Sequence, residues 1–423
     1  MRRPKIYTTL LAASVLVLGL AACTEETDGG STGPTKITFW NGFTDADRPH
    51  VEELVRRFNE SQSDVIVEMT IQPWDVINQT LLPAYAAGEG PTIIGIGAES
   101  FAGYVSAGAW APVDEVYDEG ILDTATLPAA SIEATTYQGA RYGAPMVAAA
   151  GMLYYNKSMF AEAGLPGPPE TMQQLAEYAT RLTDYREGDE ANSKYGFLLP
   201  DHGAMPHWAV LLWADGGGVV AEDNSRSLLG DPASIKAAEF WTDLVINKHI
   251  SPAGMSGVEA DNLFAAGRAA MVINGPWSSG AFTQAGIDYG IAPVPPGSAA
   301  QVCAAVSVNM HIDANATEAE KRAAFKFFEF WNSPESQIYW AVNTGFPPTR
   351  TDVPASAVAE NPTSAAFSQA VGARLYLQGL TMATQINDDV VIPTIQKMTR
   401  GEGSPAELMT AAAAQVDALL ASG

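Results

Sequence analysis

The architecture of the chain is first visible in residues 36–61, KITFWNGFTDADRPHVEELVRRFNES. Residues 36–40 are typical of a short strand, and residues 50–58 carry apolar side chains at helical spacing. The alternation continues with an expected strand at 65–71, a helix at 75–87 and a buried strand at 92–96. Strands that alternate with helices favour a parallel sheet with helices on both faces, so the sequence predicts an α/β fold.

Later segments add one more strand and several helices with clear starts. The run Met146–Asn156 is predicted to be a strand. Helices are expected from Thr171 to about Asp184, after Asp231-Pro232, after Thr317 and after Ser404, because each begins with a capping residue or proline. The last third of the chain is therefore expected to be mostly helical.

Composition excludes several classes of protein. The formal net charge is −25, which disfavours binding to nucleic acid or to anionic lipid headgroups. The five histidines form no paired ligand motif, so we expect no metal site, and no phosphate-binding loop is present, so we expect no cofactor. Cys303 lies among apolar residues and is expected to be a buried free thiol.

The first residues are typical of an export signal. Basic residues precede a short apolar run that ends in Leu20-Ala21-Ala22-Cys23. About 13 apolar residues are too few for a membrane-spanning helix, which needs about 20. The segment resembles the lipobox of bacterial lipoproteins, which implies a signal peptide at 1–22, lipidation of Cys23 and a flexible tether at 23–35. The alternative is an ordinary secreted protein with a chance cysteine at this place.

Several blocks along the mature chain resemble one family, the extracellular solute-binding proteins that deliver sugars to ABC importers. They are the opening block quoted above, LYYNKSMFAEAGLPGPPETMQQL, FAAGRAAMVINGPWSSGAF, DYGIAPVPPG and FWNSPESQIYWAVNTGFPPTR. The resemblance implies a type II periplasmic-binding-protein-like fold, with two lobes, a hinge and a ligand cleft between them. Carried onto this chain, the N-terminal lobe holds 36–144 and 276–331, and the C-terminal lobe holds 145–275 and 332–423.

The function that the resemblance implies is capture without catalysis. The protein would be the exported, lipid-anchored and monomeric binding subunit of an importer, on the outer face of the cell membrane. It would close on a neutral mono- or oligosaccharide and deliver it to the permease subunits, whose ATPase lies inside the cell.

A sugar is bound by aromatic rings that stack on its C–H faces and by carboxylates or amides that pair with its hydroxyls. In parallel sheets such ligands lie at the carboxyl ends of strands. Side chains of these types at strand ends, or where relatives border the cleft, are the candidates: Trp40, Asn41, Trp74, Asp75, Glu99, Ser100, Trp208, Asp215, Gly275, Trp277, Asn309, Phe346, Asn387 and Asp388. Trp213, Trp241, Trp331 and Trp340 are instead assigned to packing.

Two other functions stay open at this point. A binder of glycerol phosphate or a glycerophosphodiester needs cationic donors, for which Arg350 and Arg374 are available. A surface glycoside hydrolase needs two carboxylates across a sugar cleft, and Glu99 and Asp388 are the candidates for that pair. An adhesin or scaffold would have neither a small ligand nor a closing cleft.

Overall fold

The computed structural model describes residues 33–44 and 46–422. The predicted signal peptide, Cys23 and the tether as far as residue 32 lie outside the described residues. Residues 35–423 form one compact unit. Within the described part of the chain, no helix has both the length and the apolar character needed to cross a membrane.

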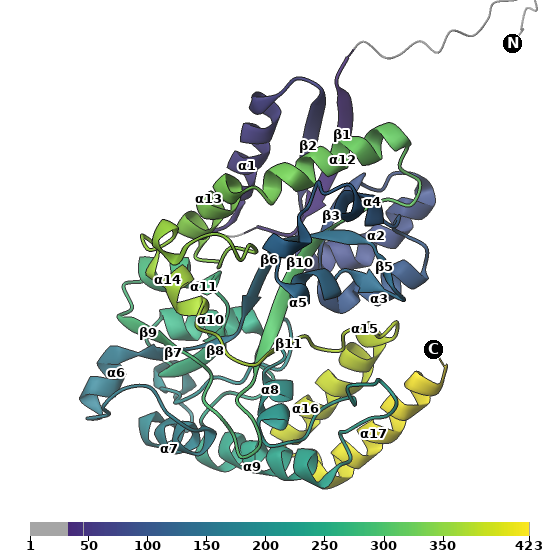
Figure 1. Cartoon of the computed structure of the whole chain (residues 1–423). Helices are drawn as coiled ribbons and strands as arrows, with labels where there is room; N and C mark the ends of the chain where they lie inside the picture. Colours follow the sequence, from purple (N-terminus) through teal and green to yellow (C-terminus); the bar gives the residue numbers. More distant parts are fainter. Residues whose placement is uncertain (1–32, 45, 423) are drawn as a thin grey trace, which may run out of the picture. The chain divides into compact units, whose positions relative to one another are not determined.

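The first sheet begins with three parallel strands in the order β2-β1-β3. They are β1 (Thr35–Asn41), β2 (Val65–Ile71) and β3 (Ile93–Gly97), connected by α1 (Arg48–Ser61) and α2 (Trp74–Ala87). Figure 1 shows this part of the chain at the top, with α1 and α12 (Glu318–Trp331) crossing one face of the strands. The strand and helix alternation predicted for residues 36–96 is confirmed.

Two long strands connect this sheet to the rest of the molecule. β10 (Cys303–Ile312) pairs antiparallel with β3 along one edge and with β6 (Gly143–Ala150) along the other. β6 leads through Gly151 into β7 (Met152–Asn156), which lies between β8 (Met271–Asn274) and β9 (Tyr289–Ala292) in a separate three-stranded sheet.

The single strand predicted at Met146–Asn156 is therefore wrong, because the chain changes sheets at Gly151. The Gly151 N–H still donates to the carbonyl oxygen of Ala304 on β10, at 2.8 Å, and β7 of the second sheet begins at the next residue. A Cβ at this position would lie 3.0 Å from the side chains of Ile273 and Met205. Glycine permits the close approach of these two side chains to the backbone at the point where the chain passes from one sheet to the next.

Each sheet has its own apolar core. The first core packs Phe39, Phe327 and Trp331 around the six-stranded sheet, which also includes the short β11 (Ala373–Arg374) at the start of β10. The second core packs Leu153 and Trp241 between the three-stranded sheet and the C-terminal helices. We call the elements around these cores the N-terminal and C-terminal lobes. The Trp277 ring packs against both cores.

The C-terminal lobe is rich in helices, and the last two of them lie in the third of the chain that is predicted to be mostly helical. Its longer helices are α7 (Met172–Leu182), α8 (His207–Ala214), α9 (Pro232–Lys248), α10 (Gly257–Ala265), α16 (Ile392–Thr399) and α17 (Pro405–Ser422). The other elements are α3 (Phe101–Ser106), α4 (Asp114–Asp118), α5 (Ala129–Glu133), β4 (Thr136–Tyr137), β5 (Ala140–Arg141), α6 (Lys157–Glu162), α11 (Ser278–Gln284), α13 (Pro334–Thr344), α14 (Pro362–Phe367), α15 (Ala383–Gln385), 3₁₀ turns at 98–100 (η1), 124–126, 190–192 and 355–357, and a π-helix η5 (Ile386–Val391).

Two segments lie on the other side of the predicted lobe boundaries. β9, which the prediction gives to the N-terminal lobe, pairs with β7 of the C-terminal lobe. α13, which the prediction gives to the C-terminal lobe, contacts α1 and α12, and its Trp340 lies in the first core. Apart from these segments, the lobe boundaries stay a prediction, because residues 35–423 form one compact unit.

An aromatic stack holds α3 against the first sheet. The His311 ring on β10 lies 3.8 Å from the Trp110 ring with the planes nearly parallel, and Phe101 stacks at 5.5 Å. His311 Nδ1 contacts the carbonyl oxygen of Tyr142 at 2.8 Å, whereas Nε2 has no partner among the described residues. Burial lowers the pKa of His311 to about 3, so the folded state keeps this ring neutral, with its one proton on Nδ1.

This buried histidine predicts a loss of stability at acidic pH. The unfolded chain binds a proton on His311 near pH 6.5, whereas the folded protein binds it only near pH 3, so stability falls as the pH drops between these values. The loss is about 1.4 kcal/mol per pH unit, or about 2 kcal/mol between pH 6.5 and 5. Urea unfolding of wild type and of His311→Gln at several pH values measures this dependence, which should be smaller in the variant by the contribution of His311 and should keep that of the buried His207, whose pKa is also lowered by burial.

The control for this prediction is His249→Asn, because His249 is exposed and its positive φ of 52° is tolerated by asparagine. Its pH dependence should equal that of wild type. Equal pH dependence in His311→Gln and wild type would contradict the assignment to His311.

Candidate functional site

Three predicted pairs of site residues meet at one edge of the first sheet. Trp40 and Asn41 end β1, Trp74 and Asp75 open α2 directly after β2, and Glu99 and Ser100 form η1 directly after β3. The strands are parallel and in register, with Trp40 opposite Thr70 of β2 and Ile94 of β3. The carboxyl ends of all three strands therefore lie together, as predicted.

The indole of Trp74 is held over a glycine at this edge. A Cβ on Gly42 would lie 2.0–2.4 Å from three atoms of the Trp74 ring system, so the ring rests on bare backbone. Phe43 packs edge-on against the ring with centroids 5.4 Å apart. Trp74 is only partly buried, so one part of a firmly placed ring stays accessible.

Trp277 repeats this arrangement at the end of β8. A Cβ on Gly275 would lie 2.0–2.4 Å from three atoms of the Trp277 ring, and the Gly275 carbonyl accepts a hydrogen bond from the Tyr154 hydroxyl at 2.8 Å. Trp277 is also partly exposed, and its ring centroid lies 6.1 Å from that of Phe346. Its contact with both apolar cores places it where the two lobes meet.

A continuous row of aromatic rings joins the two tryptophans. Trp74 contacts Phe43, Phe43 contacts Trp340 at 5.3 Å, Trp340 contacts Phe346 at 5.8 Å, and Phe346 contacts Trp277. Phe346 is 3% exposed, so it supports the neighbouring rings rather than presenting its own face. Trp340 is buried, which confirms its assignment to packing.

Glu99 combines an exposed side chain with a desolvated carboxyl group. Its side chain is solvent accessible, yet burial by the surrounding protein raises its pKa above the ordinary range. This combination is typical of a group at the floor of a concavity, where water reaches the oxygens but protein surrounds them. The pKa of the neighbouring Tyr104 is raised to about 12 by burial and, secondarily, by the charge of Glu99.

A second acidic residue predicted for the site lies in the C-terminal lobe. Asn387 and Asp388 lie in η5, and the Asn387 amide donates to the Asp388 carboxylate at 2.7 Å. Burial, together with the charge of Asp388, raises the pKa of Tyr376. Tyr376 is partly exposed, and neither a strand end nor a motif marks it in the sequence. π-Helical turns such as η5 occur frequently at functional sites.

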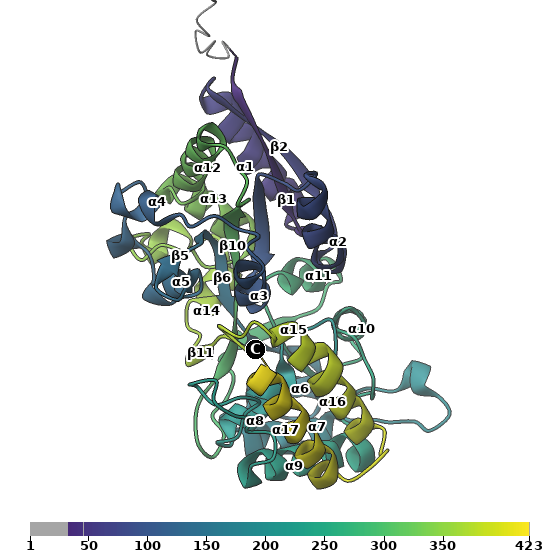
Figure 2. The same cartoon turned by 90° about the vertical axis from the view of Figure 1, so that its right-hand side faces the viewer.

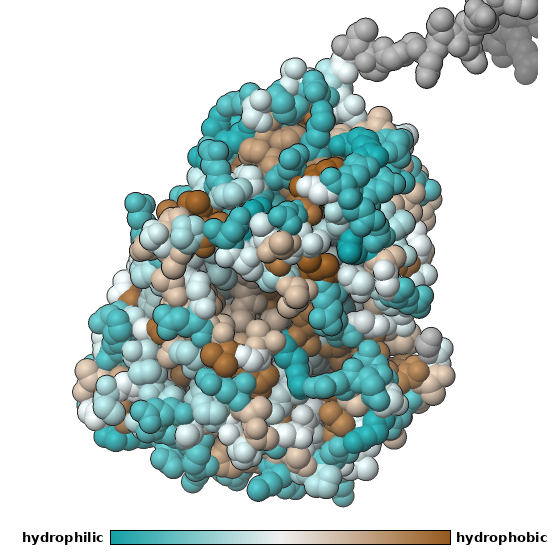
Figure 3. Space-filling model, viewed as in Figure 1, coloured by the Kyte–Doolittle hydropathy of each residue, from teal (hydrophilic) through white to brown (hydrophobic). Residues whose placement is uncertain are grey.

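Elements from the two lobes approach each other beside these residues. η1 contacts α15, which directly precedes η5, and a Cβ on Gly103 of α3 would lie 3.3 Å from the carbonyl oxygen of Thr381. Figure 2 shows α2, α3 and α11 on one side of this region and α10, α15 and α16 on the other. Figure 3 shows that the surface is hollowed at mid-height, where apolar and pale residues gather between more hydrophilic ones.

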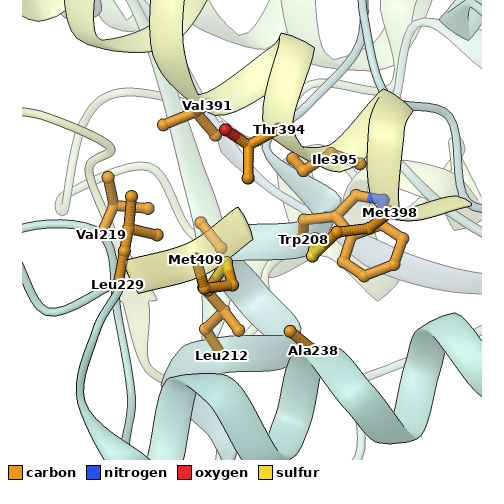
Figure 4. A pocket seen from close by; sticks show the side chains of 11 residues that line it. Trp208, Leu212, Val219, Leu229, Ala238, Val391, Thr394, Ile395, Met398 and Met409 are labelled. Atoms are coloured by element: carbon orange, nitrogen blue, oxygen red, sulfur yellow. The ribbon is translucent and has the colours of Figure 1, made fainter. Parts of the chain in front are cut away.

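Other predicted site residues have structural partners in this conformation. Trp208 is 4% exposed and lines a small apolar cavity between α8, α9, α16 and α17, with Thr394 and Met409 on other walls (Figure 4). Asp215 accepts hydrogen bonds from the backbone N–H and the hydroxyl of Ser298, at 2.9 and 2.7 Å. Their ligand roles stay predictions.

Asn41 and Asn309 are both 0% exposed. Asn41 Oδ1 accepts from the Phe43 N–H, and Asn309 Oδ1 accepts from the Ser307 hydroxyl. Neither amide nitrogen has a partner among the described residues. The ligand roles predicted for both amides remain untested, as does that of Asp75, of which the structure gives only the backbone position in α2.

The two arginines considered for a phosphate ligand are already paired. Arg350 makes two contacts of 2.8 and 2.6 Å with Asp352 and donates to the carbonyl of Asn332. Arg374 contacts Glu222 at 2.6 Å and lies over the Trp213 ring at 5.3 Å. In the part of the chain that the structure describes, no group of three or more histidine, cysteine or acidic side chains forms a metal site.

Comparisons with known proteins agree on one class. The family model described as bacterial extracellular solute-binding protein matches residues 53–366. The maltotriose-binding protein of Pyrococcus abyssi is 28% identical over 78% of this chain and 69% of that protein. The sn-glycerol-3-phosphate-binding periplasmic protein of Brucella abortus is 23% identical over 81% of this chain and 80% of that protein.

Solved structures show the same fold. An ABC transporter solute-binding protein of Thermotoga lettingae, bound with α-D-tagatose, is 25% identical, with a TM-score of 0.79 over 91% of this chain and 100% of that one. These neighbours confirm the predicted two-lobe fold, and they are substrate-binding proteins of ABC transporters rather than enzymes, so the glycoside hydrolase alternative is set aside. The chain belongs to the family of bacterial extracellular solute-binding proteins.

Proposed function

We propose that this protein captures a neutral carbohydrate between its lobes and delivers it to the permease subunits of an ABC importer. The observation that carries the proposal is the pair of partly exposed tryptophans, Trp74 and Trp277, each held over a glycine at the end of a strand. Rings fixed in this way stack on the C–H faces of a sugar with little loss of conformational freedom on binding. Trp40, which is also partly exposed, is the third candidate for stacking.

Polar groups of both lobes supply the hydroxyl contacts in this proposal. Glu99 and Ser100 approach from the N-terminal lobe, and Asn387 and Asp388 approach from the C-terminal lobe. Carboxylates accept hydrogen bonds from two neighbouring hydroxyls, and charge-assisted bonds of this kind are about twice as strong as neutral ones. A ligand that bridges the lobes would then favour the closed form by its differential affinity.

A neutral ligand is favoured over a phosphate because the cations considered for the site are paired. Glu222 and Asp352 neutralise Arg374 and Arg350, and a phosphate would have to displace these carboxylates. Maltotriose and α-D-tagatose, named for two relatives, support the carbohydrate. The sn-glycerol-3-phosphate named for a third relative keeps the phosphate as a second candidate.

The cellular setting is also part of the proposal. The lipobox-like sequence supports export and attachment of Cys23 to the outer face of the cell membrane. A tether of polar and small residues would hold the folded unit near the permease. We expect a monomer, since closure requires that both lobes move freely.

A thermal-shift screen of the chain from Gly33 onward tests the ligand class. The panel contains mono-, di- and oligosaccharides and glycerol phosphates. A ligand at 100 times its Kd adds about 2.7 kcal/mol of stability, a shift of a few degrees for a chain of this size. We expect a selective response to neutral sugars that are recovered chemically intact. A response to phosphates alone would contradict the neutral ligand and direct attention to Arg374.

Gly275→Ala tests the placement of the stacking ring. The added methyl group occupies the position of the Trp277 ring, so the indole must move away. We expect affinity for the sugar identified above to fall about tenfold, because an aromatic contact contributes about 0.5–1.5 kcal/mol beyond its buried area. Isothermal titration calorimetry measures the change.

Gly280→Ala in α11 is the matched control, because its Cβ would meet only Ala46 at an ordinary 3.5 Å. Its affinity should equal that of wild type. Unchanged affinity in Gly275→Ala, with a folded protein by circular dichroism, would show that Trp277 does not contact the ligand.

A further inference from the structure

A second hollow lies on the C-terminal lobe, away from the strand-end residues described above. Its volume is about 460 Å³, and two stretches of chain form its walls, residues 166–170 after α6 and residues 292–296 after β9. The Met172 N–H donates to the Pro296 carbonyl at 2.9 Å and fixes one wall to the other. The α6 and α7 elements beside it are at the lower left of Figure 1.

The lining of this pocket is poor in hydrogen-bond donors. Six of the twelve lining residues are prolines, which have no N–H group: Pro166, Pro168, Pro169, Pro293, Pro295 and Pro296. The two side-chain amides already donate within the protein, Gln174 to the Tyr178 hydroxyl at 3.1 Å and Gln301 to the Val294 carbonyl at 3.0 Å. Proline also makes the walls rigid, so the pocket is formed before any ligand arrives.

An acidic group and an aromatic ring complete the lining. Glu170 is exposed, and no ion pair of its carboxylate is present among the described residues. The Tyr178 ring is half-buried and packs edge-on against Phe160 with centroids 5.9 Å apart. Arg181, on the same helix as Tyr178, donates to the Ala163 carbonyl. A carboxylate and an aromatic ring, in a lining where six residues have no N–H group, together favour a cation that carries several N–H donors.

We propose that this pocket receives a lysine or arginine side chain of a protein partner. The charge of the protein supports this occupant, because a net charge of −25 attracts a basic segment before contact is made. The partner's identity as the importer's permease rests on the proposed function. The proposal that the pocket binds a basic side chain does not depend on the proposed function, since none of the residues that line the pocket is among the candidate ligand contacts.

The test uses two short peptides that differ in one charge. Acetyl-Gly-Arg-Gly-amide and its citrulline counterpart have nearly the same shape, but only the first is cationic. Each is titrated into the chain from Gly33 onward, and the NMR signals of the Tyr178 ring, assigned with Tyr178→Ala, are followed. We expect saturable shifts with the arginine peptide that weaken as salt is added, and none with citrulline. Equal shifts with both peptides, or none with either, would overturn the proposal.

Variants separate the contribution of the Tyr178 ring from that of the Glu170 carboxylate. Tyr178→Phe keeps the ring and should bind the arginine peptide like wild type, whereas Tyr178→Leu should bind it about fivefold more weakly. For the variants without the tyrosine, the shifts of the Gln174 and Gln301 side-chain amides report binding. Glu170→Gln should weaken binding to a similar extent, and Glu162→Gln on α6, an exposed glutamate outside the pocket, should leave it unchanged.

A failure of this proposal can be distinguished from a failure of the proposed function. The peptide titration needs no sugar and no permease, so its outcome does not depend on the ligand class. If Glu162→Gln weakened binding as much as Glu170→Gln, the attraction would come from the general negative charge of the surface, and the pocket assignment would be wrong.

Discussion

The antiparallel pairing of β6 with β10 is the constraint that links every other part of this molecule. Both strands begin in one lobe and end in the other, so the hydrogen bonds from Ala305 to His311 connect two separate cores. Gly151 makes the last backbone hydrogen bond to β10, and the chain then enters the second sheet as β7. A connection made of two strands resists twisting more than a single strand, yet allows bending where the ladder ends. The two paired strands therefore link the lobes through backbone hydrogen bonds, and Trp277 packs against both cores beside them.

Two glycines make room for the two candidate stacking rings in the same way. Gly42 and Gly275 lack side chains where Trp74 and Trp277 need space, so each indole lies on backbone instead of on a mobile side chain. The row of Phe43, Trp340 and Phe346 then supports both rings from behind. Exposing the apolar faces of the two indoles to water is unfavourable in free energy. This exposure is consistent with rings that are covered when a ligand binds.

Much of this arrangement could be read from the sequence, and the failures have physical causes. Strand–helix alternation predicted β1 to β3, because burial imposes a period of two on strands and 3.6 on helices. The same rule missed the break at Gly151, since β6 and β7 are both buried and leave no polar residue between them. Trp208 was a candidate because it precedes the glycine run 216–218 in the sequence, but it lies within α8, where its ring is buried. Tyr376 was missed because its closeness to Asp388 depends on tertiary packing.

Charge distribution connects the ligand region with the surface pocket. Several basic side chains are neutralised within the fold, as Arg322 contacts Glu115, Glu119 and Glu318, and Arg374 contacts Glu222. Glu99 and Glu170 are among the exposed acidic side chains for which the described part of the chain provides no cation partner. An unpaired carboxylate attracts hydrogen-bond donors, and the surroundings decide which kind. Beside stacking indoles the fitting donor would be a sugar hydroxyl, whereas in a proline-rich pocket with a tyrosine ring it would be a protonated side chain. Under the two proposals, the same excess of negative charge would thus serve a neutral ligand in one place and a basic partner in the other.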